Sequence, residues 1–305
     1  MNHSGHTGHA PAVSMPVLVF KKEQFTDEEL DTLNKVVSAQ GRQYIHLPGV
    51  MEIGEYKTLG QEGNSFDELL DKIPFNAGPV VDDSPFFYNY DRFVPKLLLA
   101  IIAAAVMAIM VFSRFNGYRV RDSRIVYFSA LGIAYIMVEI PVIQKMSLFF
   151  GSPSLAFSVA VPVLLASSGI GSLISRSKQL SKYNRYVPEM AAAIGAFLVV
   201  AGLNYIAVLP GLKRVLDKVM LAVLVLFPAG FFMGMPFPSG IARIKSGRED
   251  KAIPFMWGIN GLASVLGSTL ATVFSMKFGF SVAILAGAAV YILLFFSRLQ
   301  GKLVR

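Results

Sequence analysis

The sequence contains no cysteine and has few charged residues for its length. The absence of cysteine excludes disulfide bonds, metal sites built on thiolates and a cysteine nucleophile. Only 16% of the 305 residues are charged, whereas 54% are hydrophobic, and the mean hydropathy is +0.54. The hydrophobic residues occur in long blocks rather than in short periodic patterns, so the sequence predicts a polytopic membrane protein.

Charge of each sign is unevenly distributed along the chain. Residues 1–91 hold 6 Lys and Arg against 14 Asp and Glu, a net charge of −8, whereas residues 92–305 hold 22 against 6, a net charge of +16. The cations of the second part lie mainly in short connections between apolar blocks, where they set membrane orientation and contact lipid head groups. No basic surface with interleaved aromatic residues stands outside these blocks, so we expect no nucleic-acid partner.

The charge asymmetry and the position of the apolar blocks divide the chain into three parts. Residues 1–16 are rich in glycine, serine and proline, which is typical of a disordered tail. Residues 17–91 combine short apolar segments with helix signals, and residues 92–305 hold all the long apolar blocks. We therefore expect a tail, a partial α/β domain and a seven-helix transmembrane domain, in that order.

Residues 17–91 carry the signals of a small α/β fragment. Two short apolar segments, at 17–20 and 43–47, predict strands. Two capping boxes, Thr26–Glu29 and Ser65–Glu68, predict helix starts, and the first helix is expected at 27–40. So few elements make a weak core, so we expect them to be the end of an α/β domain whose beginning is missing from this chain.

Seven apolar blocks are each long enough to cross a bilayer as a helix. They lie at residues 94–112, 125–150, 155–174, 187–209, 219–237, 253–274 and 280–296. Fifteen cations fall on the connections at one side of this bundle and six at the other side. By the positive-inside rule we expect a multi-pass protein of the cell (inner) membrane, with the basic loops and the C-terminus in the cytoplasm.

One acidic residue, Glu139, lies near the middle of the second apolar block. An ionised side chain at that depth costs a few kcal/mol or more, so we expect it to face the bundle interior and to have a partner on another helix. Gln144 and Lys145 lie about 140° and 240° around the helix axis from Glu139, so they do not simply neutralise it. The candidate partners are Asn204 in the fourth block and Trp257 or Asn260 in the sixth block.

Two interpretations of Glu139 stay open. It is either a mid-membrane site for a proton, a cation or an amine, or a buried polar clamp between helices. Asp82 and Asp83, just ahead of the first block, are followed by four aromatic residues. These two carboxylates either bind a cation or a polyamine, or form an acidic turn before a belt of aromatic side chains at the membrane interface.

One segment predicts an interrupted helix, and another predicts unusually close packing of two helices. Residues 227–240 hold three prolines and three glycines, so an undisturbed helix is not expected there. The segment is either a broken helix that lines a substrate site or a helix that ends near Met235 and leaves through a proline-rich turn. In the sixth block, Ala263, Gly267 and Ala271 stand four residues apart, which predicts the close approach of a neighbouring helix.

Six short motifs follow one another along the chain. They are DDSPFF at 82–87, GIAYIMVEIPVIQK at 132–145, FGSP at 150–153, SGIGS at 168–172, MGMPFP at 233–238 and WGINGLASVLGS at 257–268. In this order they resemble the C-terminal membrane part of the spermidine-synthase-like integral membrane proteins. The resemblance extends over nearly the whole chain from about residue 17.

The resemblance implies a Rossmann-type aminopropyl- or methyltransferase domain fused to membrane helices, with S-adenosylmethionine or its decarboxylated form as cofactor. Residues 17–48 would then be the last strands and helix of that domain. The glycine-rich cofactor loop and the catalytic acid would lie upstream of Met1, so we expect no cofactor site and no catalysis in this chain as it stands. A cytoplasmic cofactor favours a cytoplasmic position for residues 1–91, whereas the loop charges favour the reverse, and this placement stays open.

The main functional expectation is a membrane module that binds or passes a small cationic or amphipathic molecule near Glu139. The expected site residues are Glu139, Gln144, Lys145, Asn204, Trp257, Asn260, Asp82 and Asp83. The alternative is a membrane anchor for a Rossmann-type transferase domain or subunit supplied by another polypeptide. A purely structural anchor is the third possibility.

Overall fold

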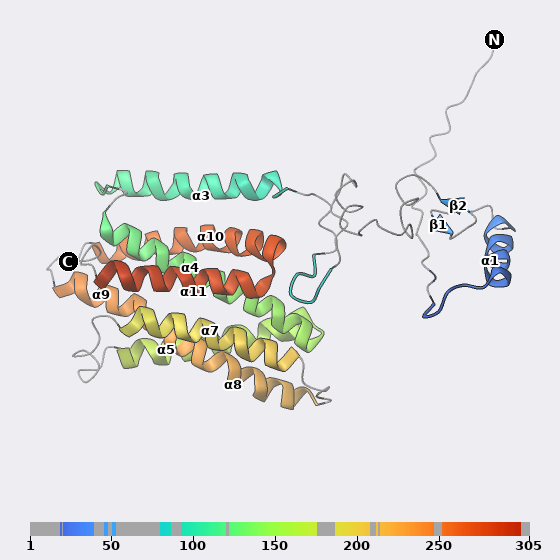
Figure 1. Ribbon diagram of the computed structural model, residues 1–305. Coiled ribbons are helices and arrows are strands. Elements are labelled where there is room, and N and C mark those ends of the chain that lie inside the picture. The colour runs from blue at the N-terminus through green and yellow to red at the C-terminus, as the bar shows by residue number, and fades with distance from the viewer. Residues whose placement is uncertain are drawn as a thin grey trace, which may run out of the picture. The chain divides into compact units, whose positions relative to one another are not determined.

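The computed structural model describes the helical parts of the chain and several short segments (Figure 1). The described residues are 19, 21–39, 46–47, 51–52, 80–86, 93–119, 122–175, 187–207, 212, 214–246 and 252–299. The chain divides into two compact units, residues 1–74 and residues 75–305. Most of the described residues are helical.

The first unit contains helix α1, Asp27–Ala39, which begins at the expected capping box. The amide of Thr26 donates to Glu29 Oε2 at 2.9 Å, and the amide of Glu29 lies 3.4 Å from Thr26 Oγ1. Lys21 Nζ lies 3.0 Å from Glu29 Oε1. The prediction of a helix start at Thr26 is therefore confirmed, because these side chains satisfy amides that have no partner inside the helix.

Two short strands follow α1 in the first unit. Strand β1, His46–Leu47, pairs with strand β2, Met51–Glu52, in an antiparallel hairpin. Three expected features lie outside the described residues: the tail at 1–16, the helix that begins at Ser65 and, apart from Val19, which is in no strand, the strand at 17–20. The Rossmann-type α/β remnant therefore stays a prediction.

In the parts of the second unit that the structure describes, seven helices are long and apolar enough to cross a membrane. They are α3 Lys96–Phe115, α4 Ser123–Phe150, α5 Pro153–Ser175, α7 Val187–Ala207, α8 Val215–Met233, α10 Ala252–Phe278 and α11 Phe280–Leu299. Each of them overlaps one of the seven predicted apolar blocks. The prediction of a multi-pass membrane protein is therefore confirmed at the level of its helices.

Local sequence explains where several of these helices begin and end. Asp122 accepts a hydrogen bond from the Arg124 amide at 2.9 Å and so caps the start of α4. Gly151, with a φ of 70°, ends α4 in the left-handed conformation that glycine adopts most readily. Pro153 then occupies the first position of α5, where its missing N–H has no cost.

The proline- and glycine-rich segment at 227–240 interrupts the fifth crossing, as expected. Helix α8 ends at Met233, and a short helix α9, Pro236–Ser246, begins after two residues. The helix does end near Met235, but the prolines that follow form the first turn of α9 rather than an exit turn. Proline is well suited to this position because its fixed φ is already helical.

Five of the membrane helices form a closed ring. Helix α4 contacts α5, α5 contacts α8, α8 contacts α7, α7 contacts α11, and α11 contacts α4 again. Helix α10 packs on α4 and α11 from outside the ring, and α3 packs on α10 (Figure 1). The ring is the part of the fold that positions the candidate site.

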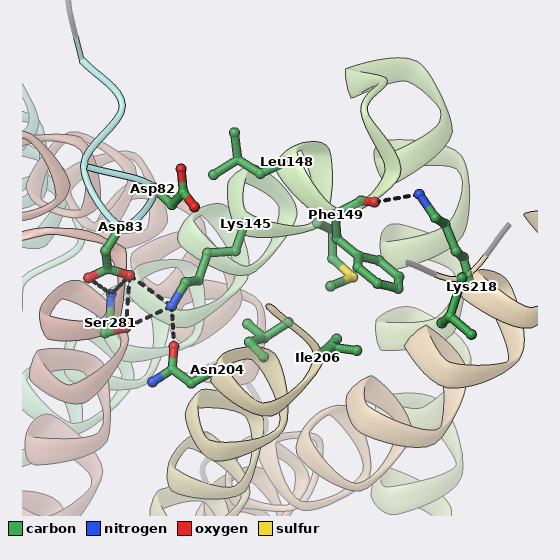
Figure 2. A pocket seen from close by; sticks show the side chains of 12 residues that line it. Asp82, Asp83, Lys145, Leu148, Phe149, Asn204, Ile206, Lys218 and Ser281 are labelled. Carbon is green, nitrogen blue, oxygen red and sulfur yellow. Dashed lines mark hydrogen bonds and ion pairs between the residues drawn. The ribbon is translucent and has the colours of Figure 1, made fainter. Parts of the chain in front are cut away.

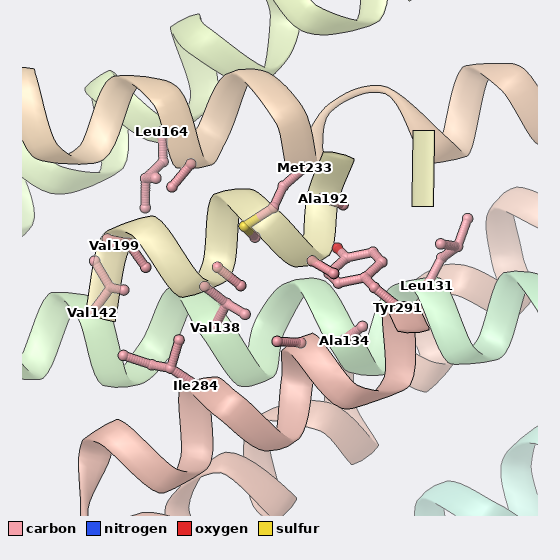
Figure 3. Packing of buried hydrophobic residues seen from close by; sticks show 14 of the residues in the cluster. Leu131, Ala134, Val138, Val142, Leu164, Ala192, Val199, Met233, Ile284 and Tyr291 are labelled. Atoms are coloured by element: carbon pink, nitrogen blue, oxygen red, sulfur yellow. The ribbon is translucent and has the colours of Figure 1, made fainter. Parts of the chain in front are cut away.

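Apolar side chains from all five ring helices meet in its core (Figure 3). Val138 of α4, Leu164 of α5, Val199 of α7, Met233 of α8 and Ile284 of α11 are each at most 3% exposed. Between helices in a membrane, such close packing replaces the hydrophobic effect as the source of association. The ring is therefore held along most of its length by side-chain packing.

Glycine allows α10 to approach α4 closely. A Cβ on Gly267 would lie 2.9 Å from both the Cα and the carbonyl oxygen of Ile133, so no side chain fits there. Ala263 and Ala271, on the same face of α10, are fully buried. The predicted face of small residues in the sixth block is thus confirmed as a helix contact.

This contact predicts the effect of enlarging Gly267. Gly267→Leu should force α10 away from the backbone of α4 and destabilise the protein by about 1–3 kcal/mol. The matched control is Gly261→Leu on the same helix, because an added Cβ there meets nothing within 4 Å. Thermal unfolding in detergent measures both variants, and equal midpoints for the two would contradict the close approach.

Candidate functional site

A pocket of about 580 Å³ lies at the end of the ring where α4 and α7 end and where α8 and α11 begin (Figure 2). Its polar lining comes from the segment 80–86 and from these four helices. The polar side chains are Asp82, Asp83, Lys145, Asn204, Lys218 and Ser281. The pocket therefore brings together groups that are as many as 199 positions apart in the sequence.

Lys145, near the end of α4, is held by three acceptors (Figure 2). Its Nζ lies 2.7 Å from Asp83 Oδ1, 2.6 Å from Asn204 Oδ1 and 2.8 Å from Ser281 Oγ. An ammonium group has three N–H donors, so these bonds use all of them. The side chain is only 11% exposed, and it ties α4, α7, α11 and the segment 80–86 together.

Asp83 also caps the start of α11 from far away in the sequence. The Ser281 amide lies 3.2 Å and 3.1 Å from the two carboxylate oxygens, and the Ser281 hydroxyl donates to Oδ1 at 2.8 Å. The Phe280 amide donates to the Asp83 carbonyl oxygen at 2.7 Å. A helix start favours a carboxylate because its free N–H groups and its dipole are both positive there.

Gly279 makes room for this cap. Its φ of +91° lies in the left-handed region, and an added Cβ would lie 2.5 Å from Asp83 Oδ2. Any other residue there would be both strained and in collision with the carboxylate. The turn between α10 and α11 is therefore shaped to receive Asp83.

The bonds to Asp83 decide its protonation. Partial burial alone would raise the pKa of Asp83, but the hydrogen bonds from Lys145 and Ser281 outweigh burial and lower the pKa below its usual value. A carboxylate with a lowered pKa stabilises the fold above its unfolded pKa of about 3.9. This contribution is lost as the pH falls through the lower, folded pKa.

Asp83→Asn should therefore lower the thermal stability at pH 7 by about 1–2 kcal/mol, a value reduced for solvent screening. Thermal unfolding of wild type and Asp83→Asn is measured from pH 7 down to pH 3. The difference in stability between the two proteins should shrink below pH 4. Asp82→Asn is the matched control, since Asp82 is exposed. A difference between wild type and Asp83→Asn that does not change with pH would contradict the charged role of Asp83.

Four of the expected site residues meet in this pocket, namely Asp82, Asp83, Lys145 and Asn204. The other four lie elsewhere. Trp257 is 61% exposed and packs edge-on against Phe237, with ring centroids 4.6 Å apart. Asn260 donates from Nδ2 to the Phe128 carbonyl oxygen at 3.0 Å and so ties α10 to α4.

Glu139 is partly buried on α4. Tyr135 precedes Glu139 by four residues, or about one turn of the same helix. The three candidate partners make other contacts: Asn204 bonds to Lys145, Asn260 bonds to the Phe128 carbonyl oxygen, and Trp257 packs against Phe237. Within the described parts of the chain, the Glu139 carboxylate has no hydrogen-bonding or ionic partner.

Gln144 does not line the pocket. Its Oε1 is buried and accepts no hydrogen bond from the described residues. Lys145, the next residue, reaches the pocket because neighbouring positions on a helix point about 100° apart. Gln144 therefore stays a candidate from the sequence without a described partner.

A second polar cluster closes the opposite end of the ring. Glu189, in the first turn of α7, forms a buried ion pair with Arg298, in the last turn of α11. The Tyr127 hydroxyl donates to Glu189 Oε1 at 2.6 Å and lies 3.1 Å from the Pro236 carbonyl oxygen. Glu189 and Arg298 also suit the dipoles of the helix ends that they occupy.

This second cluster was missed in the sequence because Glu189 falls inside a predicted apolar block. The signal was an acid in the first turn of one membrane helix and an arginine in the last turn of another. Tyr127, Glu189 and Arg298 are all at most 4% exposed. The cluster is thus a sealed polar contact, in contrast to the open pocket at the other end.

Three polar levels follow one another along α4. Glu139 precedes Lys145 by six residues, or about 9 Å along the helix axis, and follows Tyr127 by twelve residues, or about 18 Å. The pocket, the partly buried acid and the sealed cluster therefore lie in that order from one end of the ring to the other.

No protein family, curated protein or solved structure matches this chain. Its function is therefore argued from the geometry of the pocket and of the ring.

Proposed function

We propose that this membrane protein binds a small amphipathic molecule with a cationic amine in the pocket and passes it into the ring toward Glu139. The observation that carries the proposal is the position of Asp82. Its carboxylate is exposed, lines the pocket and has no bonded partner among the residues that the structure describes. An unpaired carboxylate at the mouth of a pocket attracts a cation.

The other groups of the pocket support an organic amine as the ligand. Lys145 and Asp83 satisfy each other and the start of α11, so they have little left to offer a ligand. Leu148, Ile206 and Leu212 line the pocket with apolar surface suited to a hydrocarbon chain. A metal ion would need several acidic or histidine ligands together, and no such group of three occurs in the described part of the chain.

The ring supports access from one end. The pocket is open, whereas Tyr127, Glu189 and Arg298 close the other end in a buried cluster. Separating Glu189 from Arg298 would leave each desolvated charge without compensation, so this end stays shut until something separates the charges. Binding therefore comes first, and passage requires the sealed cluster to open.

The alternative proposal is a membrane anchor for a transferase that uses S-adenosylmethionine or its decarboxylated form. One observation favours it: the segment 80–86, which precedes the first membrane helix, is fastened to α11 by Asp83. Such a fixed segment suits a protein that holds a catalytic domain, supplied by a second polypeptide, close to the membrane. In this alternative the cofactor site lies on the transferase polypeptide. Binding of S-adenosylmethionine to this chain alone would contradict that placement.

Octylamine tests the main proposal. Isothermal titration of the protein in nanodiscs, corrected for binding to empty nanodiscs, should show that Asp82→Asn weakens octylamine binding about tenfold, or ~1.4 kcal/mol. Asp217→Asn is the matched control, because Asp217 is an exposed acid near the start of α8 and does not line the pocket. Equal affinities for wild type and Asp82→Asn would refute the pocket.

Passage is tested separately with a permanent cation that crosses lipid slowly. Proteoliposomes should take up radiolabelled hexyltrimethylammonium, and Glu139→Gln should reduce the initial rate at least tenfold while octylamine binding at the pocket stays within twofold. Equal uptake by both proteins would remove Glu139 from the route and leave a binding protein.

A further inference from the structure

The charges of the pocket also indicate which amines it accepts, an inference that depends on the proposed function. We infer that the ligand is a linear molecule with an ammonium group at one end and an anionic group at the other. A linear diamine or polyamine is disfavoured by Lys218, a cation of the pocket wall that a ligand can reach.

Lys218 is a fixed cation on the pocket wall. Its Nζ donates to the Phe149 carbonyl oxygen at 2.9 Å and lies 5.4 Å from the centroid of the Phe149 ring. The carbonyl belongs to the last turn of α4, where a cation is favoured by the free carbonyl groups and the helix dipole. One N–H of the ammonium is used in this way, and two remain for a ligand.

Asp82 and Lys218 lie on opposite sides of the pocket (Figure 2). Leu148 and Phe149 lie between them along one wall, and Ile206 lies on the wall of Asn204. A ligand that satisfies both charges must therefore carry its own charges at separate ends of a hydrocarbon chain. Opposite charges on adjacent carbons would reach only one of the two residues.

Lys145 and Asp83 do not change this assignment. The Lys145 ammonium has all three N–H groups bonded, and the Asp83 carboxylate is bonded to Lys145 and Ser281. Among the described residues that line the pocket, the charges available to a ligand are thus Asp82 at one side and Lys218 at the other. A second ammonium placed beside Lys218 meets a like charge, which is unfavourable in a partly enclosed pocket.

Three ligands of eight carbons test the inference. They are 8-aminooctanoate, its isomer 2-aminooctanoate, whose charges are adjacent, and 1,8-diaminooctane, whose charges are both positive. Titration calorimetry of the full chain in nanodiscs should give 8-aminooctanoate the lowest Kd, at least tenfold below that of each of the others. A diamine that binds as tightly as 8-aminooctanoate would overturn the inference.

Charge reversal at Lys218 provides the second arm. Lys218→Glu should invert the order, so that 1,8-diaminooctane binds at least tenfold more tightly than 8-aminooctanoate. Arg214→Glu, which makes the same charge change four residues earlier and outside the pocket lining, should keep the wild-type order. An unchanged order in Lys218→Glu would contradict the role of Lys218.

Two further readouts keep the result interpretable. If thermal unfolding shows that Lys218→Glu does not fold, Lys218→Gln retains a donor for the Phe149 carbonyl and should reduce the preference for 8-aminooctanoate over the diamine to below threefold. Octylamine binding that depends on Asp82, without any preference for 8-aminooctanoate, overturns this inference but leaves the proposed function intact. The absence of binding by any of the amines refutes both.

Discussion

The ammonium of Lys145 is the interaction on which the functional end of the ring depends. A charged group at the edge of a membrane bundle is costly unless its hydrogen bonds are satisfied, and here Asp83, Asn204 and Ser281 supply an acceptor for each N–H. These acceptors come from three separate parts of the chain. Their convergence fixes the ends of α4 and α7 and the start of α11, and among the described lining residues it leaves Asp82 and Lys218 as the charges that a ligand can use.

The two ends of the ring use charge in different ways. At the pocket, the ion pair of Lys145 and Asp83 is partly exposed and borders an open volume. At the other end, Glu189 and Arg298 are almost fully buried. Buried ion pairs seldom add much net stability, but they specify one arrangement because the loss of either partner leaves a charge without compensation. Between the ends the packed core of the ring is mainly apolar, although its described helices also carry Glu139, Gln144 and the buried Ser167. Such a gradient from open to sealed is compatible with entry from one side.

Features that depend on local sequence could be predicted, whereas contacts between distant segments could not. The seven helices follow from bilayer thickness, and the break at Gly234 follows from the adjacent prolines. The sequence left three candidate partners for Glu139 open, because helical spacing gives an angle around one helix and not the neighbour that it meets. The pairing of Asp83 with Lys145 joins positions 62 residues apart, and Glu189 lies within a predicted apolar block, so no local pattern indicated which segments meet in either contact.

Lys145 and Asp83 hold this end of the ring together through one shared, charged contact. A double-mutant cycle tests it most directly, with Asp83→Asn, Lys145→Gln and the double variant compared with wild type by thermal unfolding in detergent at pH 7. The account predicts that the two substitutions are strongly non-additive, with a coupling free energy of about 1–3 kcal/mol. Additive effects, within about 0.3–0.5 kcal/mol, would show that the two residues stabilise the protein independently and would contradict the account.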